Sequence, residues 1–216
     1  MRLGRAALAA SVGYLIGTFP TADLVARRAS GGLTDLRSSG SGNPGGANAV
    51  KVLGKRAGYT IMGVDITKGA AASVVGGFVA GPTGAHLAGT ASVVGHCLPV
   101  WNGFRGGKGV AASIGQCLAT FPAYFPVDLT VAAVTVALPR WKHRSFAATA
   151  ASSICWVLGG VVWWRRQLPN LWGPRPSVAL PIAAAASSAM IVSRFLMAKP
   201  PNAVSTAAAN DDRLAR

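Results

Sequence analysis

The stretch VAASIGQCLATFPAYFPVDLTVAAVTVAL, residues 110–138, decides how many helices this chain can form in a membrane. It is apolar over more than the about 20 residues that one helix needs to cross a bilayer. Pro122 and Pro126 fall in its middle, and proline breaks a helix unless neighbouring groups satisfy the freed backbone. We therefore predict two short helices here, with one kinked helix as the alternative.

Five further apolar stretches have the length of a membrane-spanning helix: residues 6–26, 57–80, 83–100, 146–164 and 178–197. The chain is 51% hydrophobic and only 12% charged, against about 25% charged residues in an ordinary soluble domain. The sequence predicts an all-α polytopic membrane protein with about seven transmembrane helices. We expect residues 1–198 to form one domain and residues 199–216 to form a disordered tail. A cleaved signal peptide is the alternative for the first stretch, but its apolar run is long and no small-residue cleavage site precedes a soluble domain.

Cations outnumber anions strongly, with 21 Lys and Arg against 6 Asp and Glu. In a membrane protein such an excess sets orientation through the positive-inside rule, so we predict no nucleic-acid partner. Placing the loops at 27–56, 101–109 and 139–145 and the tail from 198 on one side gathers most of these cations. These loops are therefore expected to face the cytoplasm.

The first of three polar segments is DLRSSGSGNPGGANAVKVLGK, residues 35–55. Glycines with Ser and Asn allow backbone N–H groups to turn inward and form a nest for an anion. The helix that follows adds the positive end of its dipole, and Lys51 adds a full charge. This segment predicts a phosphate site, with a flexible linker as the alternative.

The second polar segment is VDITKG, residues 64–69, inside an apolar stretch. Asp65 and Lys68 stand three residues apart and so share one helix face, where they can pair. Ionisable residues within a membrane span are costly and usually mark a functional site. A purely structural ion pair is the alternative.

The third polar segment is GHCLPVWNGFRGGKGVAAS, residues 95–113. Its Gly-Gly-Lys-Gly turn, beside Arg105, opens directly into a helix at Val110, which combines backbone donors, a helix N-terminus and the mobile ammonium of Lys108. It is not a Walker A loop, because Lys108 is followed by Gly. His96, just before the turn, is either a hydrogen-bonded structural residue or a catalytic one.

These segments carry long motifs in the order and spacing of a known family. The motif D-x-R-x-x-G-S-G-N-P-G-A-T-N-x-x-R is matched by Asp35, Arg37, Gly40, Ser41, Gly42, Asn43, Pro44, Gly45 and Asn48. The element F-D-x-x-K-G is matched by Asp65, Lys68 and Gly69. The motif G-H-x-x-P-V-F-x-x-F-K-G-G-K-G-V-A is matched by Gly95, His96, Pro99, Val100, Phe104, Gly106, Gly107, Lys108, Gly109, Val110 and Ala111. In these residues the chain resembles the bacterial membrane family of acyl-phosphate:glycerol-3-phosphate acyltransferases.

The resemblance implies a seven-helix protein of the bacterial cell membrane with its motifs on the cytoplasmic side. It implies transfer of a fatty acyl group from acyl phosphate to the 1-hydroxyl of glycerol 3-phosphate, giving lysophosphatidic acid and phosphate. It also implies that the 106–109 loop holds the acyl-phosphate headgroup. Glycerol 3-phosphate would then be held by Ser41, Asn43, Lys51, Lys108 and Ser145. No H-x4-D signature follows any histidine, so we expect catalysis by positioning and electrostatics, with a substrate phosphate accepting the hydroxyl proton.

We predict catalytic roles for Ser41, His96 and Lys108. Substrate-binding roles are predicted for the remaining glycine and polar positions: Gly40, Gly42, Asn43, Gly45, Asn48, Lys51, Asp65, Lys68, Arg105, Gly106, Gly107, Gly109 and Ser145. The partners expected are acyl phosphate, glycerol 3-phosphate and membrane lipid. No metal or cofactor is expected, because Cys97, Cys117 and Cys155 are isolated and show no metal-ligand spacing.

The chain departs from the family pattern in its first and third motifs. Gly46-Ala47 stands where the first motif has Ala-Thr. Lys51 stands where the family has Arg, which keeps the charge but loses bidentate phosphate binding. The family's third motif, H-x-x-N-I-x-R-L, is echoed only by Arg194 and Leu196. A diverged inactive relative is therefore an alternative. Another is a small transporter or binding protein for phosphorylated solutes, since transporters also combine broken helices with intramembrane charge.

Overall fold

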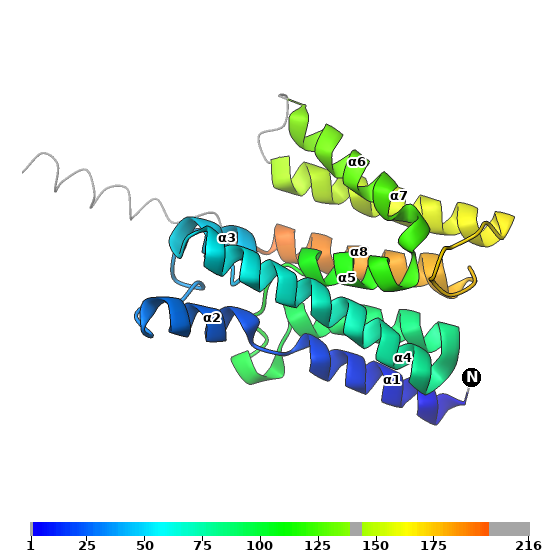
Figure 1. Cartoon of the computed structure of the whole chain (residues 1–216), viewed down its shortest axis with the longest axis horizontal. Helices are drawn as coiled ribbons and strands as arrows, with labels where there is room; N and C mark the ends of the chain where they lie inside the picture. Colours follow the sequence, from blue (N-terminus) through cyan, green and yellow to red (C-terminus); the bar gives the residue numbers. More distant parts are fainter. Residues whose placement is uncertain (1, 139–143, 199–216) are drawn as a thin grey trace, which may run out of the picture.

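The computed structural model describes residues 2–138 and 144–198, so the predicted disordered tail at 199–216 lies outside the described residues. The described part is helical throughout and contains no strand. Its α-helices are α1 (Leu3–Gly17), α2 (Thr21–Ser30), α3 (Gly46–Val52), α4 (Lys55–Cys97), α5 (Val110–Thr120), α6 (Phe125–Ala137), α7 (Arg144–Arg166) and α8 (Ala179–Leu196). Two short 3-10 helices, η1 (Val100–Asn102) and η2 (Pro122–Tyr124), connect them (Figure 1).

The two helices predicted between residues 110 and 138 are confirmed, because α5 and α6 meet at a bend of 112°. Phe121 leaves the helical conformation just before Pro122, as the residue before a proline tends to do. The carbonyls freed at this break are bonded from the loop after α7. Asn170 donates to the carbonyl of Thr120 at 3.0 Å, and Trp172 donates to that of Leu118 at 2.9 Å. A single kinked helix is excluded.

Helix α4 covers two of the predicted stretches and doubles back on itself (Figure 1). The turn lies at Ala80 and Gly81, where Gly81 has φ +69°, a conformation that suits glycine, and Pro82 starts the second half. The two halves touch closely, since a Cβ added at Gly76 would strike Gly84 and Ala88. The stretches 57–80 and 83–100 therefore form a tight helical hairpin.

The first predicted stretch, residues 6–26, does not form one helix, and this corrects the sequence-based expectation. It breaks into α1 and α2 at residues 18–20. Pro20 has no N–H to donate and keeps Phe19 out of the helical conformation. The break leaves the carbonyls of Gly17 and Phe19 without helical partners, and the functional site makes use of both.

The first and third polar segments lie at one end of the bundle (Figure 1). The loop between α2 and α3, the segment between α4 and α5, the start of α7 and the end of α8 all lie there. The N-terminus, the turn inside α4 and the loop between α7 and α8 lie at the opposite end. The described parts of the loops grouped by positive charge in the sequence are thus neighbours in space.

By length and composition, three described helical segments can cross a membrane: Leu3–Ser30, Arg144–Arg166 and Ala179–Leu196. The bent pair of α5 and α6 makes a fourth if it counts as one crossing. Large apolar side chains are exposed on the outside of the bundle, with exposed fractions of 61–83% for Phe78 of α4, Ile154 of α7 and Ile182 of α8. An apolar outer surface of this kind suits lipid rather than water.

Small residues let α4 and α5 approach closely, as is common between membrane helices. Gly69 of α4 rests against the carbonyl of Ala112, and Gly115 of α5 rests against the backbone of Ile66 and Ala70. A Cβ at Gly115 would lie 2.7 Å from the backbone nitrogen of Ala70. The start of α5, which carries the third polar segment, is thereby fixed against α4.

Gly115→Ala is therefore expected to destabilise the protein by about 1–3 kcal/mol, because backbone atoms on the facing helix cannot move aside cheaply. Gly63→Ala is the matched control, since nothing lies within 4 Å of a Cβ at that position. It is expected to be neutral or to stabilise by up to about 1 kcal/mol through helix propensity. Thermal unfolding in detergent micelles measures both, and equal shifts in the two variants would refute the close packing.

Candidate functional site

Asn48 organises the first polar segment from inside. Its Oδ1 accepts from the backbone N–H of Ser41 at 2.8 Å, and its Nδ2 donates to the carbonyls of Leu36 at 3.1 Å and Ser39 at 2.9 Å. Asn48 is 3% exposed, so these three bonds occupy its amide. A Cβ at Gly40 would strike the same Oδ1, which explains the glycine there. The geometry thus gives Asn48 a loop-holding position rather than one facing solvent.

Three backbone N–H groups of the loop are already hydrogen-bonded within the first polar segment. Besides the N–H of Ser41, that of Gly42 bonds the carbonyl of Ser39 at 3.1 Å, and that of Gly45 bonds the carbonyl of Asn43 at 2.8 Å. Ser41 itself is exposed, and so is Lys51 in the last turn of α3. The groups that the first segment presents outward are therefore a hydroxyl and an ammonium.

Arg37 joins the first polar segment to the third. Its Nε donates to the carbonyl of Arg105 at 2.8 Å, and its other nitrogens pair with both carboxylate oxygens of Asp23. Asn102 donates to the same carboxylate at 2.6 Å. Asp23 was not predicted as a site residue. The sequence could have pointed to it, because it is the one acidic residue of the first apolar stretch. This cluster ties α2 and both glycine-rich loops together.

Asp65, Lys68 and His96 form a second buried cluster, with exposed fractions of 3–8% for their side chains. Asp65 Oδ1 lies 2.9 Å from Lys68 Nζ and 3.7 Å from His96 Nδ1. Lys68 also donates to the carbonyls of Phe19 at 2.9 Å and Gly17 at 3.3 Å. These are the carbonyls freed by the break between α1 and α2. The charge and donors of Lys68 are thus used inside the protein.

The glycines of the third segment allow its backbone to lie directly on the end of α4. The N–H of Gly106 bonds the carbonyl of Cys97, and that of Gly107 bonds the carbonyl of His96, both at 3.1 Å. A Cβ at Gly107 would collide with the imidazole ring of His96. Gly109 has φ +88° and sits beside the Sγ of Cys97. His96 and these glycines therefore form one packed unit.

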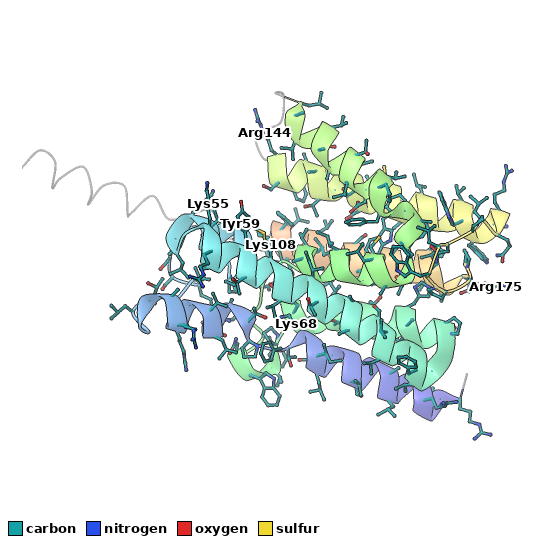
Figure 2. The ribbon with its side chains drawn as sticks, in the orientation of Figure 1. Lys55, Tyr59, Lys68, Lys108, Arg144 and Arg175 are labelled. Atoms are coloured by element: carbon teal, nitrogen blue, oxygen red, sulfur yellow. The ribbon has the colours of Figure 1, made fainter. Side chains whose placement is uncertain are left out.

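The ammonium of Lys108 lies over the ring of Phe195, 4.0 Å from its centroid. Partial burial lowers the pKa of Lys108 from its usual value. Within the described residues, no ion pair involves Lys51, Arg105 or Lys108. Figure 2 shows Lys108 at the polar end of the bundle, the end that also carries Lys55 and Arg144. Unlike Lys68, it retains a charge that an anion can use.

Ser145 is exposed at the second position of α7. The next residue, Phe146, packs its ring against that of Phe195 with 5.7 Å between centroids. The ammonium of Lys108 lies over this same Phe195 ring, so the start of α7 lies near Lys108. The structure thus brings the predicted serine of α7 toward the third polar segment.

A cavity of about 30 Å³ lies between the two clusters, walled by Asp23, Arg37, Asp65, Lys68 and His96 together with the backbone of residues 106–107. Its arginine and lysine are both ion-paired. The volume suits one or two water molecules. The cavity thus has polar walls in which both cations already have a carboxylate partner.

Arg194 was not among the predicted site residues, yet it contacts the third segment directly. Its Nη2 donates to the carbonyl of Gly106 at 2.9 Å, and its Nε donates to that of Gly107 at 3.3 Å. The sequence could have pointed to Arg194, because it is the one charged residue in the last apolar stretch, residues 178–197. Within residues 2–138 and 144–198, no cluster of metal-ligating side chains occurs, and all three cysteines are free thiols.

Comparison with known proteins agrees across sequence and structure. The family model for glycerol-3-phosphate acyltransferase matches residues 7–199. A glycerol-3-phosphate acyltransferase of Maricaulis maris is 37% identical over 165 residues, which cover 76% of this chain and 74% of that protein. The enzyme of the same name from Thermoanaerobacter pseudethanolicus is 33% identical over 159 residues, covering 74% of this chain and 78% of that protein.

Two solved structures share the fold. The crystal structure of PlsY (YgiH), an integral membrane glycerol 3-phosphate acyltransferase, in its glycerol 3-phosphate form aligns with a TM-score of 0.71 and 27% identity, over 88% of each chain. Its lysophosphatidic acid form aligns with a TM-score of 0.68 and 25% identity, over 88% of this chain and 87% of that one.

Proposed function

Since this chain belongs to the glycerol-3-phosphate acyltransferase family, we propose that it transfers a fatty acyl group to the 1-hydroxyl of glycerol 3-phosphate. The product is lysophosphatidic acid, and the acyl donor is acyl phosphate. The hydroxyl oxygen forms the new ester bond to the acyl carbon, while the bond from that carbon to the phosphate oxygen breaks. The phosphate leaves with the electron pair, and the hydroxyl proton passes to a phosphate oxygen.

One observation supports this function most directly: the cations at the polar end divide into paired and unpaired groups. Arg37 and Lys68 are held by carboxylates, whereas Lys51, Arg105 and Lys108 have no ion-pair partner among the described residues. Both substrates are anions, and their reaction develops negative charge that fixed donors stabilise. The unpaired group is thus suited to bind both phosphates.

We assign the acyl-phosphate headgroup to Lys108, Arg105 and the N-terminus of α5. The N–H groups of Gly106 and Gly107 are already bonded to the end of α4, so the donors for this phosphate come from the first turn of α5. Gly109, the N-cap residue immediately before α5, has no side chain that could cap these N–H groups. Ser41, Lys51 and Ser145 are the exposed groups assigned to the phosphate of glycerol 3-phosphate.

The acyl chain is assigned to an apolar groove between α1 and the first half of α4. Its volume is about 540 Å³, and its apolar walls are Leu15, Ile16, Phe19, Val64, Ala71 and Trp101. Lys68 and residues 18–20 border both this groove and the polar cavity. A chain lying here would carry its headgroup toward the loop at 106–109.

In the membrane, we assign seven crossings to α1, the two halves of α4, and α5 to α8, with α2 and α3 at the polar end. The positive-inside rule places that end in the cytoplasm, so the protein is assigned to the bacterial cell membrane. A transporter would be expected to carry its binding groups near the middle of the bilayer. Lys108 lies instead toward one end of the bundle, the end that also carries Lys55 and Arg144 (Figure 2).

The test is an assay of purified protein in detergent with palmitoyl phosphate, with and without glycerol 3-phosphate. We expect phosphate release that depends on glycerol 3-phosphate and a matching yield of lysophosphatidic acid. A folded protein that releases no phosphate would instead be an inactive relative. Release without lysophosphatidic acid would identify a phosphatase activity and refute acyl transfer.

A further inference from the structure

The last turn of α8 holds the loop at 106–109 through two successive residues. Arg194 donates to the carbonyls of Gly106 and Gly107, at 2.9 and 3.3 Å. The next residue, Phe195, lies under the ammonium of Lys108, 4.0 Å from the ring centroid. One residue of this turn thus contacts the loop backbone, and its neighbour contacts the loop's charged side chain.

We propose that this turn positions Lys108 for acyl transfer, with Arg194 fixing the backbone that carries Lys108 and Phe195 fixing its ammonium. Both act through Lys108 and are positioning residues, not catalytic ones. This inference rests on the function proposed above. It also gives a role to the part of α8 that retains Arg194 but lacks the histidine and asparagine expected from the third family motif.

The backbone argument follows from the bonds on both edges of the loop. The N–H groups of Gly106 and Gly107 are bonded to the end of α4, and their carbonyls are bonded to Arg194. A guanidinium is suited to this task because its N–H groups form a rigid fork, which an ammonium cannot reproduce. Removing Arg194 frees one edge of each peptide, and Lys108 follows immediately in the chain.

The side-chain argument depends on what kind of partner Phe195 is. A carboxylate would neutralise Lys108 and occupy its donors, as Asp65 does for Lys68. An aromatic face attracts an ammonium yet leaves its N–H groups free for an anion. The ring of Phe146 packs against the ring of Phe195, with 5.7 Å between the two centroids, and so restrains the Phe195 ring. Phe195 can therefore hold a flexible lysine in place without consuming its charge.

The Arg194 test compares R194Q and R194K with wild type, and R175Q is the control, because Arg175 is exposed at the opposite end of the bundle (Figure 2). Hydrogen exchange of the peptide covering residues 105–109 is measured without substrate. R194Q is expected to speed this exchange about 10- to 100-fold, since two bonds from a charged donor are lost. It is expected to lower kcat about 10- to 100-fold, with little change in KM for glycerol 3-phosphate. R194K is expected to restore both the exchange rate and kcat part of the way to wild type. R175Q is expected to have the exchange rate and kcat of the wild-type protein.

The Phe195 test compares F195L, which keeps an apolar side chain without a ring, with F195Y, which keeps the ring. The readout is the rate at which an amine-acetylating reagent modifies Lys108, followed by mass spectrometry without substrate. F195L is expected to raise this rate several-fold and to lower acyl transfer, because the attraction to the ring is lost. F195Y is expected to behave like wild type in both measurements.

Wild-type exchange and wild-type kcat in R194Q would overturn the proposal, as would faster exchange with unchanged kcat, which would mean a structural role alone. An unchanged rate of Lys108 acetylation in F195L would overturn the role of the ring. If wild-type protein makes no lysophosphatidic acid while exchange and acetylation respond as expected, the proposed function fails and the contacts to the loop stand.

Discussion

Lys108→Gln is expected to lower glycerol-3-phosphate-dependent acyl transfer on the order of 10²- to 10³-fold, the usual effect of removing one donor to developing negative charge. Lys108 combines an unpaired ammonium, held over Phe195, with a place two residues before α5 begins. Glutamine keeps a polar side chain of similar reach but removes the charge. The measurement is lysophosphatidic acid formed per unit time from palmitoyl phosphate by purified protein.

Lys55→Gln is the matched control, since Lys55 is an exposed lysine at the same end of the bundle and has no assigned role (Figure 2). It is expected to change the rate less than about threefold, as a screened surface charge would. Comparable losses in both variants would point to a general effect of positive charge. Full activity in Lys108→Gln would remove Lys108 from the reaction.

Asp65→Asn and Lys68→Met are each expected to lower the free energy of unfolding by about 3–5 kcal/mol, because each leaves an uncompensated charge buried in the bundle. Their side chains are 3% and 7% exposed, and their charged atoms are 2.9 Å apart. The double variant is expected to be more stable than the sum of the single losses predicts. Unfolding titrated with sodium dodecyl sulfate in mixed micelles provides the comparison.

Asp35→Asn is the control for this cycle, because Asp35 is 57% exposed and its carboxylate lies 3.6 Å from the Arg37 guanidinium. The Asp35 Oδ1 also accepts from the backbone N–H of Arg37 at 2.9 Å, a bond that the amide oxygen of asparagine can still accept. It is expected to cost at most about 1 kcal/mol. The cycle also separates the two interpretations of Asp65 and Lys68. Unchanged stability together with a raised KM for glycerol 3-phosphate would favour substrate binding over the structural pairing argued here.

A structural role for this pair makes physical sense in a membrane. The break at Pro20 leaves the carbonyls of Gly17 and Phe19 outside the helical bonding pattern, and lipid cannot satisfy such groups. Lys68 donates to both, and the N–H of Thr21 also donates to that of Phe19. Asp65 then balances the ammonium and lies near His96, whose own carbonyl holds Gly107. A defect in the first helix is thus compensated by a charged pair that also supports the loop carrying Lys108.

The sequence by itself determined the features that depend on neighbouring residues. Apolar length predicted the helices, and Pro122 predicted the bend between α5 and α6, because a proline acts on its own stretch of backbone. The spacing of Asp65 and Lys68 predicted their contact, since residues three apart share a helix face. The family motifs pointed to the loops that gather at one end of the bundle.

Only the tertiary structure decided which polar groups are already occupied. Arg37 is paired with Asp23 from another helix, Lys68 is bonded to carbonyls 49 and 51 residues earlier, and Arg194 is bonded to carbonyls 87 and 88 residues earlier. The prediction from the sequence grouped Lys68 with Lys51 and Lys108 as site residues, and it did not include Arg37 or Arg194. Ion pairs and hydrogen bonds form between whatever groups packing brings within reach, so the distinction between supporting cations and available ones arises only when the helices assemble.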